Sequence, residues 1–185
     1  NPNYTGQSGN CTTYNMSVNA VEIKQANRVL YSRAHNSGGY NGCTGSTGQY
    51  TLWSSTSMFT LKVGGTYSIG FTTGPTYAVG IGVWIDLNGD NDFADADEWR
   101  SSGWCTPLIS PGGSTLSYFP LSIPANASIG TTRMRIRSIY NACSTGDNGC
   151  SSYSYGEAED YTITLASDPN DAGITAITPP LCSPA

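Results

Sequence analysis

The chain has 185 residues, a formal net charge of −5 and only 8 Lys plus Arg. Charged residues make up 11% of it, against about 25% in an average soluble domain, and Gly, Ser, Thr, Asn and Tyr fill the difference. With so few basic side chains we expect no binding to nucleic acid or to an anionic membrane surface. The chain contains no run of 18 apolar residues, so we predict no membrane-spanning helix.

Apolar and polar side chains alternate along much of the chain, which predicts β-strands with one wet face. A helix over residues 22–31 is an alternative, but Val21, Ile23, Val29 and Tyr31 favour two short strands broken at 26–27. The same alternation occurs further along the chain at residues 60–63, 67–71, 133–137 and 161–165.

Two further strands are predicted from composition. The apolar run over residues 78–87 predicts a central strand, and residues 117–123 predict an edge strand because Pro120 cannot donate a backbone hydrogen bond. Eight or nine short strands indicate an all-β fold, an antiparallel β-sandwich of jelly-roll-like form. We expect residues 1–166 to form this domain and residues 167–185 to form a linker or the start of another module.

Six cysteines in a weakly charged chain predict a secreted protein with disulfide bonds. Cys143 and Cys150 would close a small loop, and Cys11 and Cys43 would tie down the N-terminal segment. Cys105 and Cys182 are left, to bond each other or, for Cys182, to pair within a following module. Since His35 is the single histidine and no CxxC pair occurs, we expect no Cys/His zinc site.

The acidic loop, residues 86–98, carries the sharpest motif. Oxygen-bearing side chains stand at positions 1, 3, 5, 7 and 12 of a twelve-residue loop, namely Asp86, Asn88, Asp90, Asp92 and Asp97, with Glu98 one step beyond. Calcium takes six to eight oxygen ligands, so Ca²⁺ is the expected cofactor and Mg²⁺ is less favoured. Asn91 stands where an EF-hand loop has Gly, and Asn tolerates the left-handed conformation. The alternative is a solvated acidic turn; Asp95 and Glu157 are weaker candidate ligands.

A second acidic group, Glu157, Glu159 and Asp160, lies near the last predicted strand. It could supply metal ligands or catalytic carboxylates. It could equally form ion pairs with the arginines of a neighbouring strand, which are Arg133, Arg135 and Arg137. The sequence leaves these alternatives open.

Four tryptophans raise the possibility of a carbohydrate-binding surface, because flat rings stack on sugars. Trp53, Trp99 and Trp104 are the candidates, whereas Trp84 is expected in the core. No GxSxG motif or fixed acid pair indicates catalysis, so we expect no enzyme, with a hydrolase as the third possibility after a sugar-binding module.

Three segments together resemble the GEVED domain family of secreted bacterial proteins, a family common in Bacteroidetes with type IX secretion. They are residues 83–93, 132–137 and 155–161, and the last reads Gly-Glu-Ala-Glu-Asp where the family has Val in place of Ala158. Residues 42–43, Tyr50 and 57–63 are similar to its first half, so the resemblance spans about residues 10–166. It implies a non-catalytic module beside proteases, glycosidases or adhesins, and an Ig-like module beginning in the tail.

We therefore expect an extracellular or cell-surface calcium-binding module that acts in adhesion or as a structural or accessory domain. Its expected partners are neighbouring domains of a larger protein and a surface glycan or protein ligand. Copies of itself in an extracellular filament are an alternative.

Overall fold

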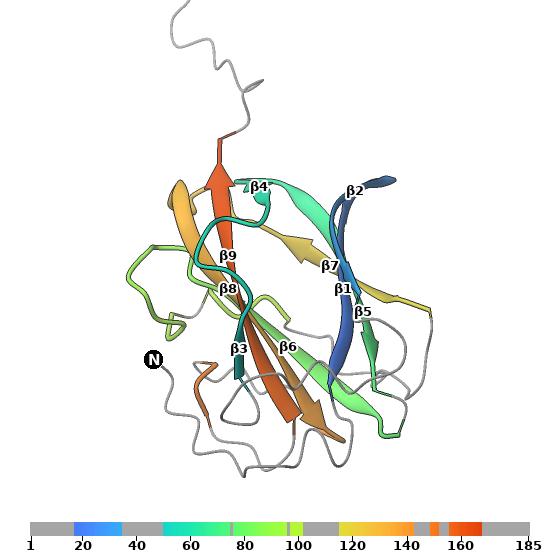
Figure 1. The fold of residues 1–185 in the computed structure, drawn as a ribbon. Coiled ribbons are helices and arrows are strands. Elements are labelled where there is room, and N and C mark those ends of the chain that lie inside the picture. Colours follow the sequence, from blue (N-terminus) through green and yellow to red (C-terminus); the bar gives the residue numbers. More distant parts are fainter. Residues whose placement is uncertain are drawn as a thin grey trace, which may run out of the picture.

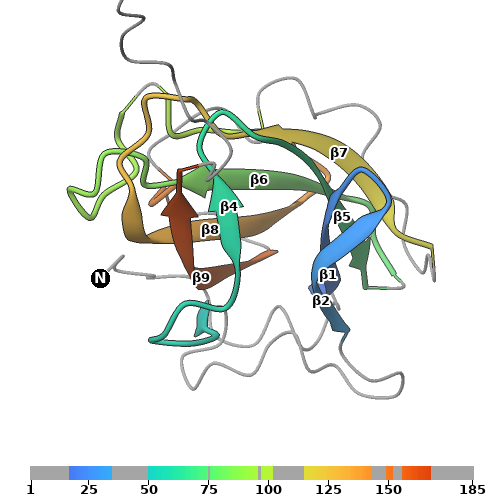
Figure 2. The ribbon, with the colours of Figure 1, turned by 90° about the horizontal axis from the view of Figure 1, so that it is seen from above.

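The structure is a computed structural model that describes residues 17–34, 50–74, 76–95, 97–101, 115–142, 149–151 and 156–167. These residues form nine strands arranged in two sheets that face each other (Figures 1 and 2). The strands are β1 (Val18–Gln25), β2 (Arg28–Ala34), β3 (Tyr50–Leu52), β4 (Thr60–Lys62), β5 (Thr66–Thr73), β6 (Val79–Ile85), β7 (Ser117–Ser122), β8 (Gly130–Tyr140) and β9 (Gly156–Ala166).

The first sheet is antiparallel, with the order β2-β1-β5-β7, and the second has the order β3-β9-β8-β6, with β4 also paired to β9. In the second sheet, β3 and β4 run parallel to β9. The expected antiparallel pairing holds for β6, β8 and β9 but is wrong for β3 and β4. The reason is that one extended segment follows the edge of β9 from its start to its end, so both of its short strands point the same way. Trp53 and Met58 continue the contact between them through backbone hydrogen bonds to β9.

The periodicity arguments are confirmed in the first sheet. Strands β1 and β2 form a hairpin with a two-residue turn at Ala26 and Asn27, and not a helix. Ala26 has a φ of 51°, the left-handed conformation that tight hairpin turns require. Strand β7, which contains Pro120, lies at the sheet edge as its proline predicts.

Strand β6 is completely buried, yet it is the last strand of its sheet rather than a central one. Residues 98–101 cover its outer edge. Ile85 donates a backbone hydrogen bond to Glu98, Arg100 donates one to Val83, and the Ser101 hydroxyl accepts the Val83 N–H. A return segment without regular pairing thus protects the edge and explains why the sequence reads as a central strand.

The core lies between the two sheets, where Ile23, Ile69 and Phe71 of the first face Ile136 and Ile163 of the second. The outer face of the second sheet is also covered: Trp84 is fully buried there, as predicted, with Arg135 and Arg137. The described part of the chain has no apolar helix of membrane-spanning length.

Several predictions lie outside the described residues. Among these are Trp104, His35, the tail from residue 168 and the cysteines Cys11, Cys43, Cys105, Cys143 and Cys182. Cys150 is described, but Cys143, its predicted partner, is not. The disulfide pairs, the domain limits and the jelly-roll order stay predictions.

A candidate metal centre and the groove beside it

The acidic loop follows β6 and lies on the outer face of the second sheet, away from the first (Figures 1 and 2). Three hydrogen bonds hold its start in place. The Asp86 N–H donates to the Arg133 carbonyl (3.0 Å), the Thr132 hydroxyl donates to the Asp86 carbonyl (2.6 Å), and the Ser128 N–H donates to the Leu87 carbonyl (2.7 Å). The loop therefore starts from a fixed backbone position.

The buried Asp86 side chain organises the turn that follows it. Its two carboxylate oxygens accept the N–H groups of Gly89 (2.7 Å) and Asn91 (3.1 Å). Both residues have positive φ, 82° for Gly89 and 73° for Asn91. The prediction that Asn91 can take the left-handed conformation at position 6 is confirmed.

Ligand-type oxygens of Asp86, Asp90 and Glu98 all lie within 4.8 Å of one another. Glu98 is buried and accepts the Leu87 N–H (3.0 Å). Burial raises the pKa of Glu98, and the nearby charges of Asp86 and Asp95 raise it further. An all-oxygen set in which carboxylates repel one another suits a hard cation such as Ca²⁺, because the ion would cancel the repulsion.

The other predicted ligands within the loop are exposed, whereas Glu157 is buried on the opposite side of β9. The Asn88 side-chain amide donates to Asp90 (2.9 Å) and Asp95 (2.6 Å), and Asp92 accepts the Ala94 N–H (2.7 Å). Asp97, predicted at position 12, lies outside the group of three, and Glu98 takes the place expected for it. Hydrogen bonding to Ile85 brings Glu98 back beside the start of the loop.

Asp160 forms a buried ion pair on the same outer face. Arg135 binds both carboxylate oxygens of Asp160, with Nε at 2.7 Å and Nη2 at 2.8 Å. The Tyr50 hydroxyl donates to Asp160 (2.9 Å), and Arg133 approaches it at 3.6 Å. The Phe93 ring of the acidic loop lies 4.8 Å from the Arg135 guanidinium, so the loop packs directly on this ion pair.

Glu157 and Glu159 point to the other side of β9, between the two sheets, where both are buried. Arg33 of β2 reaches across from the first sheet and binds Glu159 at 2.7 Å. The Val18 N–H donates to Glu157. The sequence left open whether this acidic group pairs with the arginines of β8. Asp160 does pair with Arg135 of β8, whereas Glu159 pairs with Arg33 of β2. No sequence signal indicated Arg33, because it lies 126 positions away on the opposite sheet.

Glu157 should make folding sensitive to high pH. Burial, and then the charge of Glu159, raise the pKa of Glu157 well above its ordinary value of 4.5. The protonated Glu157 side chain contributes to the free energy of unfolding. This contribution is complete below about pH 4.5 and is lost as the pH rises through the pKa of Glu157 in the folded state. We expect Glu157→Gln to be more stable than the wild type at pH 8, with the difference shrinking toward pH 4, in urea unfolding curves.

Glu22→Gln is the matched control. Lys24 and Tyr118 lower the pKa of the partly buried Glu22 of β1, so the wild type should lose that small contribution as pH falls, not as it rises. A difference between Glu157→Gln and the wild type that stays constant from pH 4 to 8 would contradict the burial argument.

Residues 80–164 match the family model of the GEVED domain. This part of the chain is a GEVED domain. The match runs from β6 through the acidic loop to β9, so it contains Asp86, Glu98, the Arg135–Asp160 ion pair and both buried glutamates. No curated protein matches the chain.

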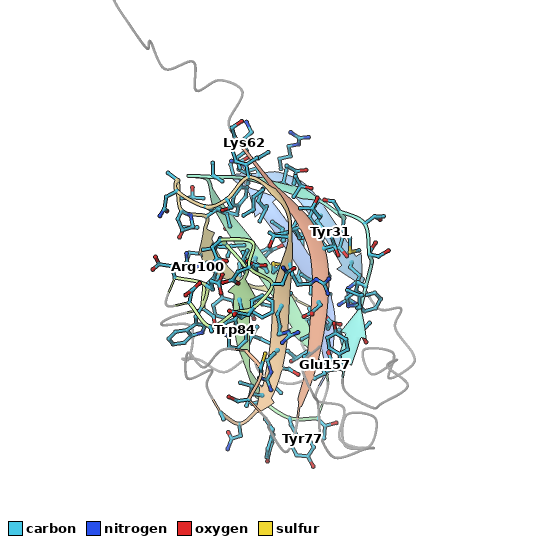
Figure 3. The ribbon with its side chains drawn as sticks, turned by 90° about the vertical axis from the view of Figure 1, so that its left-hand side faces the viewer. Tyr31, Lys62, Tyr77, Trp84, Arg100 and Glu157 are labelled. Carbon is cyan, nitrogen blue, oxygen red and sulfur yellow. The ribbon has the colours of Figure 1, made fainter. Side chains whose placement is uncertain are left out.

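Two of the candidate sugar-stacking tryptophans are partly buried; Trp53 precedes the residues that match the GEVED model, and Trp99 lies within them. The Arg33 guanidinium covers the Trp53 ring at 3.8 Å, and Trp53 also packs on the core beside Tyr161. The backbones of Trp99 and Trp84 form an isolated antiparallel β-bridge, and the Trp99 indole N–H donates to the Ser101 hydroxyl (2.7 Å). In Figure 3, Trp84 and Arg100 lie on the loop side of the second sheet, while Glu157 lies at the lower end of β9.

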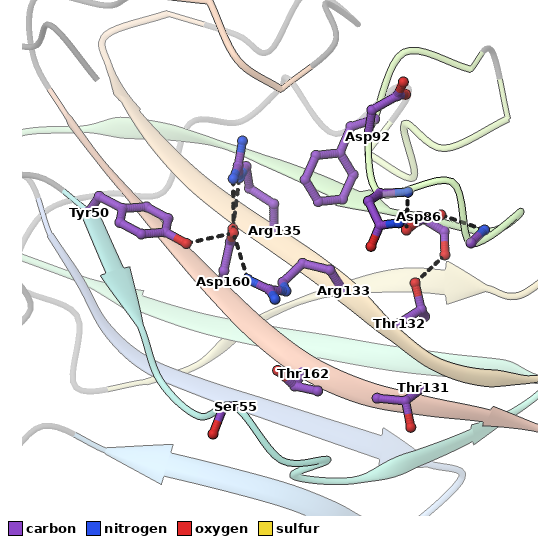
Figure 4. A pocket seen from close by; sticks show the side chains of 13 residues that line it. Tyr50, Ser55, Asp86, Asp92, Thr131, Thr132, Arg133, Arg135, Asp160 and Thr162 are labelled. Carbon is purple, nitrogen blue, oxygen red and sulfur yellow. Dashed lines mark hydrogen bonds and ion pairs between the residues drawn. The ribbon is translucent and has the colours of Figure 1, made fainter. Parts of the chain in front are cut away.

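A polar groove of about 420 Å³ opens between the acidic loop and the β8–β9 face of the GEVED domain (Figure 4). Asp86, Asn91 and Phe93 line it on the loop side. Tyr50, Ser55, Thr131, Thr132, Arg133, Asp160 and Thr162 are among its other lining residues. No local sequence pattern indicated this groove, because the contributing residues come from four separate stretches of chain.

Proposed function

We propose that this GEVED domain is a non-catalytic extracellular module whose acidic loop binds Ca²⁺. The ion would rigidify the loop on the outer face of the second sheet. The module would act in adhesion or as a structural or accessory domain beside other domains of a secreted or cell-surface protein. A subunit of an extracellular filament is the alternative within this class. The six cysteines, the low charge and the family support an extracellular setting.

The observation that carries the calcium proposal is the approach of Asp86, Asp90 and Glu98. Two of these carboxylates are buried, so their repulsion is poorly screened by water. The Asn88 amide donates to Asp90 and Asp95, and the Asp92 N–H donates to Asp90, so Asn88, Asp92 and Asp95 could complete an oxygen shell after side-chain movements.

Chelation tests the ion. When the calcium concentration is 100 times the dissociation constant, binding stabilises the fold by about 2.7 kcal/mol. For a domain of this size, that corresponds to a rise in melting temperature of about 5–10 °C. We expect that rise when millimolar CaCl₂ replaces EDTA in thermal melts followed by circular dichroism. Magnesium should raise the melting temperature less.

Two variants identify the ligands. Glu98→Gln keeps the acceptor for Leu87 but removes the buried charge, so the calcium-dependent rise should largely disappear while the EDTA melt is unchanged or higher. Asp97→Asn is the control, because Asp97 is exposed and outside the group. A melt that does not respond to calcium would leave the loop as an acidic turn, and loss of the response only in Asp97→Asn would restore the ligand predicted from spacing.

A further inference from the structure

Arg133 brings a positive charge to the groove, and the ion pair with Asp160 neutralises this charge only in part. Its side chain is 39% exposed, and among the described residues its ion pair is a 3.6 Å approach to Asp160. The Asp160 oxygen concerned already accepts hydrogen bonds from Arg135 (2.8 Å) and Tyr50 (2.9 Å). A guanidinium has five N–H donors, so Arg133 keeps donors for a ligand in the groove.

On the β8–β9 side of the groove two guanidinium groups lie beside one carboxylate, and the carboxylates of Asp86 and Asp92 belong to its loop side. Arg133 and Arg135 carry two positive charges against the single negative charge of Asp160. On the loop side, Asp86 turns both carboxylate oxygens toward the backbone N–H groups of Gly89 and Asn91. Figure 4 shows the Asp92 carboxylate directed away from the groups around Asp160. The exposed part of the Arg133 guanidinium can therefore pair with an anion in the groove.

Hydroxyl groups surround this charge. Thr131 and Ser55 are exposed in the groove, and the hydroxyls of Thr132 and Thr162 donate inward to backbone carbonyls. Because these two donate inward, their oxygens remain as acceptors for donors from a ligand. A site for an apolar peptide side chain would instead be lined mainly by apolar groups.

We propose that this groove binds an acidic saccharide, with Arg133 pairing to the carboxylate of a uronic acid and the hydroxyl lining accepting hydrogen bonds from the sugar. Its volume of about 420 Å³ lies in the range of small-ligand sites, about 300–1,000 Å³. The proposal deepens the proposed function, since it assigns a ligand class to the face beside the calcium loop. It places sugar binding at Arg133 and not at Trp53 or Trp99.

Calorimetric titration with trigalacturonate and with its fully methyl-esterified form tests the charge directly, because the two probes differ in their carboxylates. We expect the wild-type domain to bind the acid at least 10-fold more tightly than the ester. Arg133→Gln should abolish that preference. Arg133→Lys should retain part of it, because Lys keeps the charge but loses the paired donors. Arg28→Gln, which removes an exposed arginine on the other sheet, should change nothing.

Several results would overturn the proposal: no binding of either probe at millimolar concentration, equal affinity for acid and ester, or an unchanged preference in Arg133→Gln. Tighter binding of a glutamate-rich peptide would overturn the saccharide assignment. Titrations in CaCl₂ and in EDTA keep this result separate from the calcium proposal, whose own readout is the thermal melt without sugar. Melting curves of each variant verify that it folds.

Discussion

Gly156→Ala should destabilise the domain by about 2–6 kcal/mol, the combined cost of a strained backbone and an overpacked site. Gly156 begins β9 with a φ of 137°, a conformation that side-chain-bearing residues rarely adopt. An added Cβ would overlap the carbonyl oxygen of Ser138 and would lie 2.8 Å from its carbonyl carbon. Since these atoms are backbone of the paired strand β8, they cannot move without disturbing the β8–β9 ladder.

Gly130→Ala is the matched control for this prediction. Gly130 begins β8 with a φ of 143°, and no heavy atom lies within 4 Å of the position of an added Cβ. It shares the backbone strain but not the collision, so the difference between the two variants in urea unfolding isolates the contact with Ser138. Equal losses of unfolding free energy would mean that strain alone accounts for the effect.

Most of the strands could be predicted from sequence because they depend on local periodicity or on an apolar run, whereas the three-residue strand β3 was not predicted. The alternation through residues 133–137 and 161–165 places Met134, Ile136, Tyr161 and Ile163 on the core side, as the structure has them. The central position expected for β6 was wrong, because a buried edge strand covered by residues 98–101 has the same composition as a central one.

The candidate site could be predicted only where it is local in sequence. Spacing drew attention to Asp86 and Asp90, but it placed position 12 at Asp97, since loop counting takes no account of how the chain returns to β6. Pairing of that return segment with Ile85 brings in Glu98, which was also among the ligands predicted from sequence, one step beyond position 12. Contacts across the sandwich, such as Arg33 with Glu159, and the groove around Arg133 depend on tertiary packing that no local pattern encodes.

Asp160→Ala should cost about 3–5 kcal/mol, the usual effect of removing one partner of a buried ion pair. Arg135 and Asp160 are almost completely buried, with 2% and 3% of their side chains exposed. Removal of the carboxylate leaves the Arg135 charge and the Tyr50 hydroxyl without this acceptor. The Phe93 ring on Arg135 should transmit the loss to the acidic loop. Urea unfolding of Asp160→Ala against Asp97→Ala, an exposed carboxylate expected to change stability by less than about 0.5 kcal/mol, measures it.

A double change distinguishes the penalty of an unpaired charge from the strength of the pair. Replacing both partners by apolar residues, as in Arg135→Met with Asp160→Leu, removes the buried charges together, and such replacements are often neutral or stabilising. We therefore expect the double variant to be more stable than Asp160→Ala by about 2 kcal/mol or more. If instead the double variant is the less stable of the two, Arg135 stabilises the fold mainly through its packing under Phe93 and its hydrogen bond to the Gly149 carbonyl, and not through Asp160.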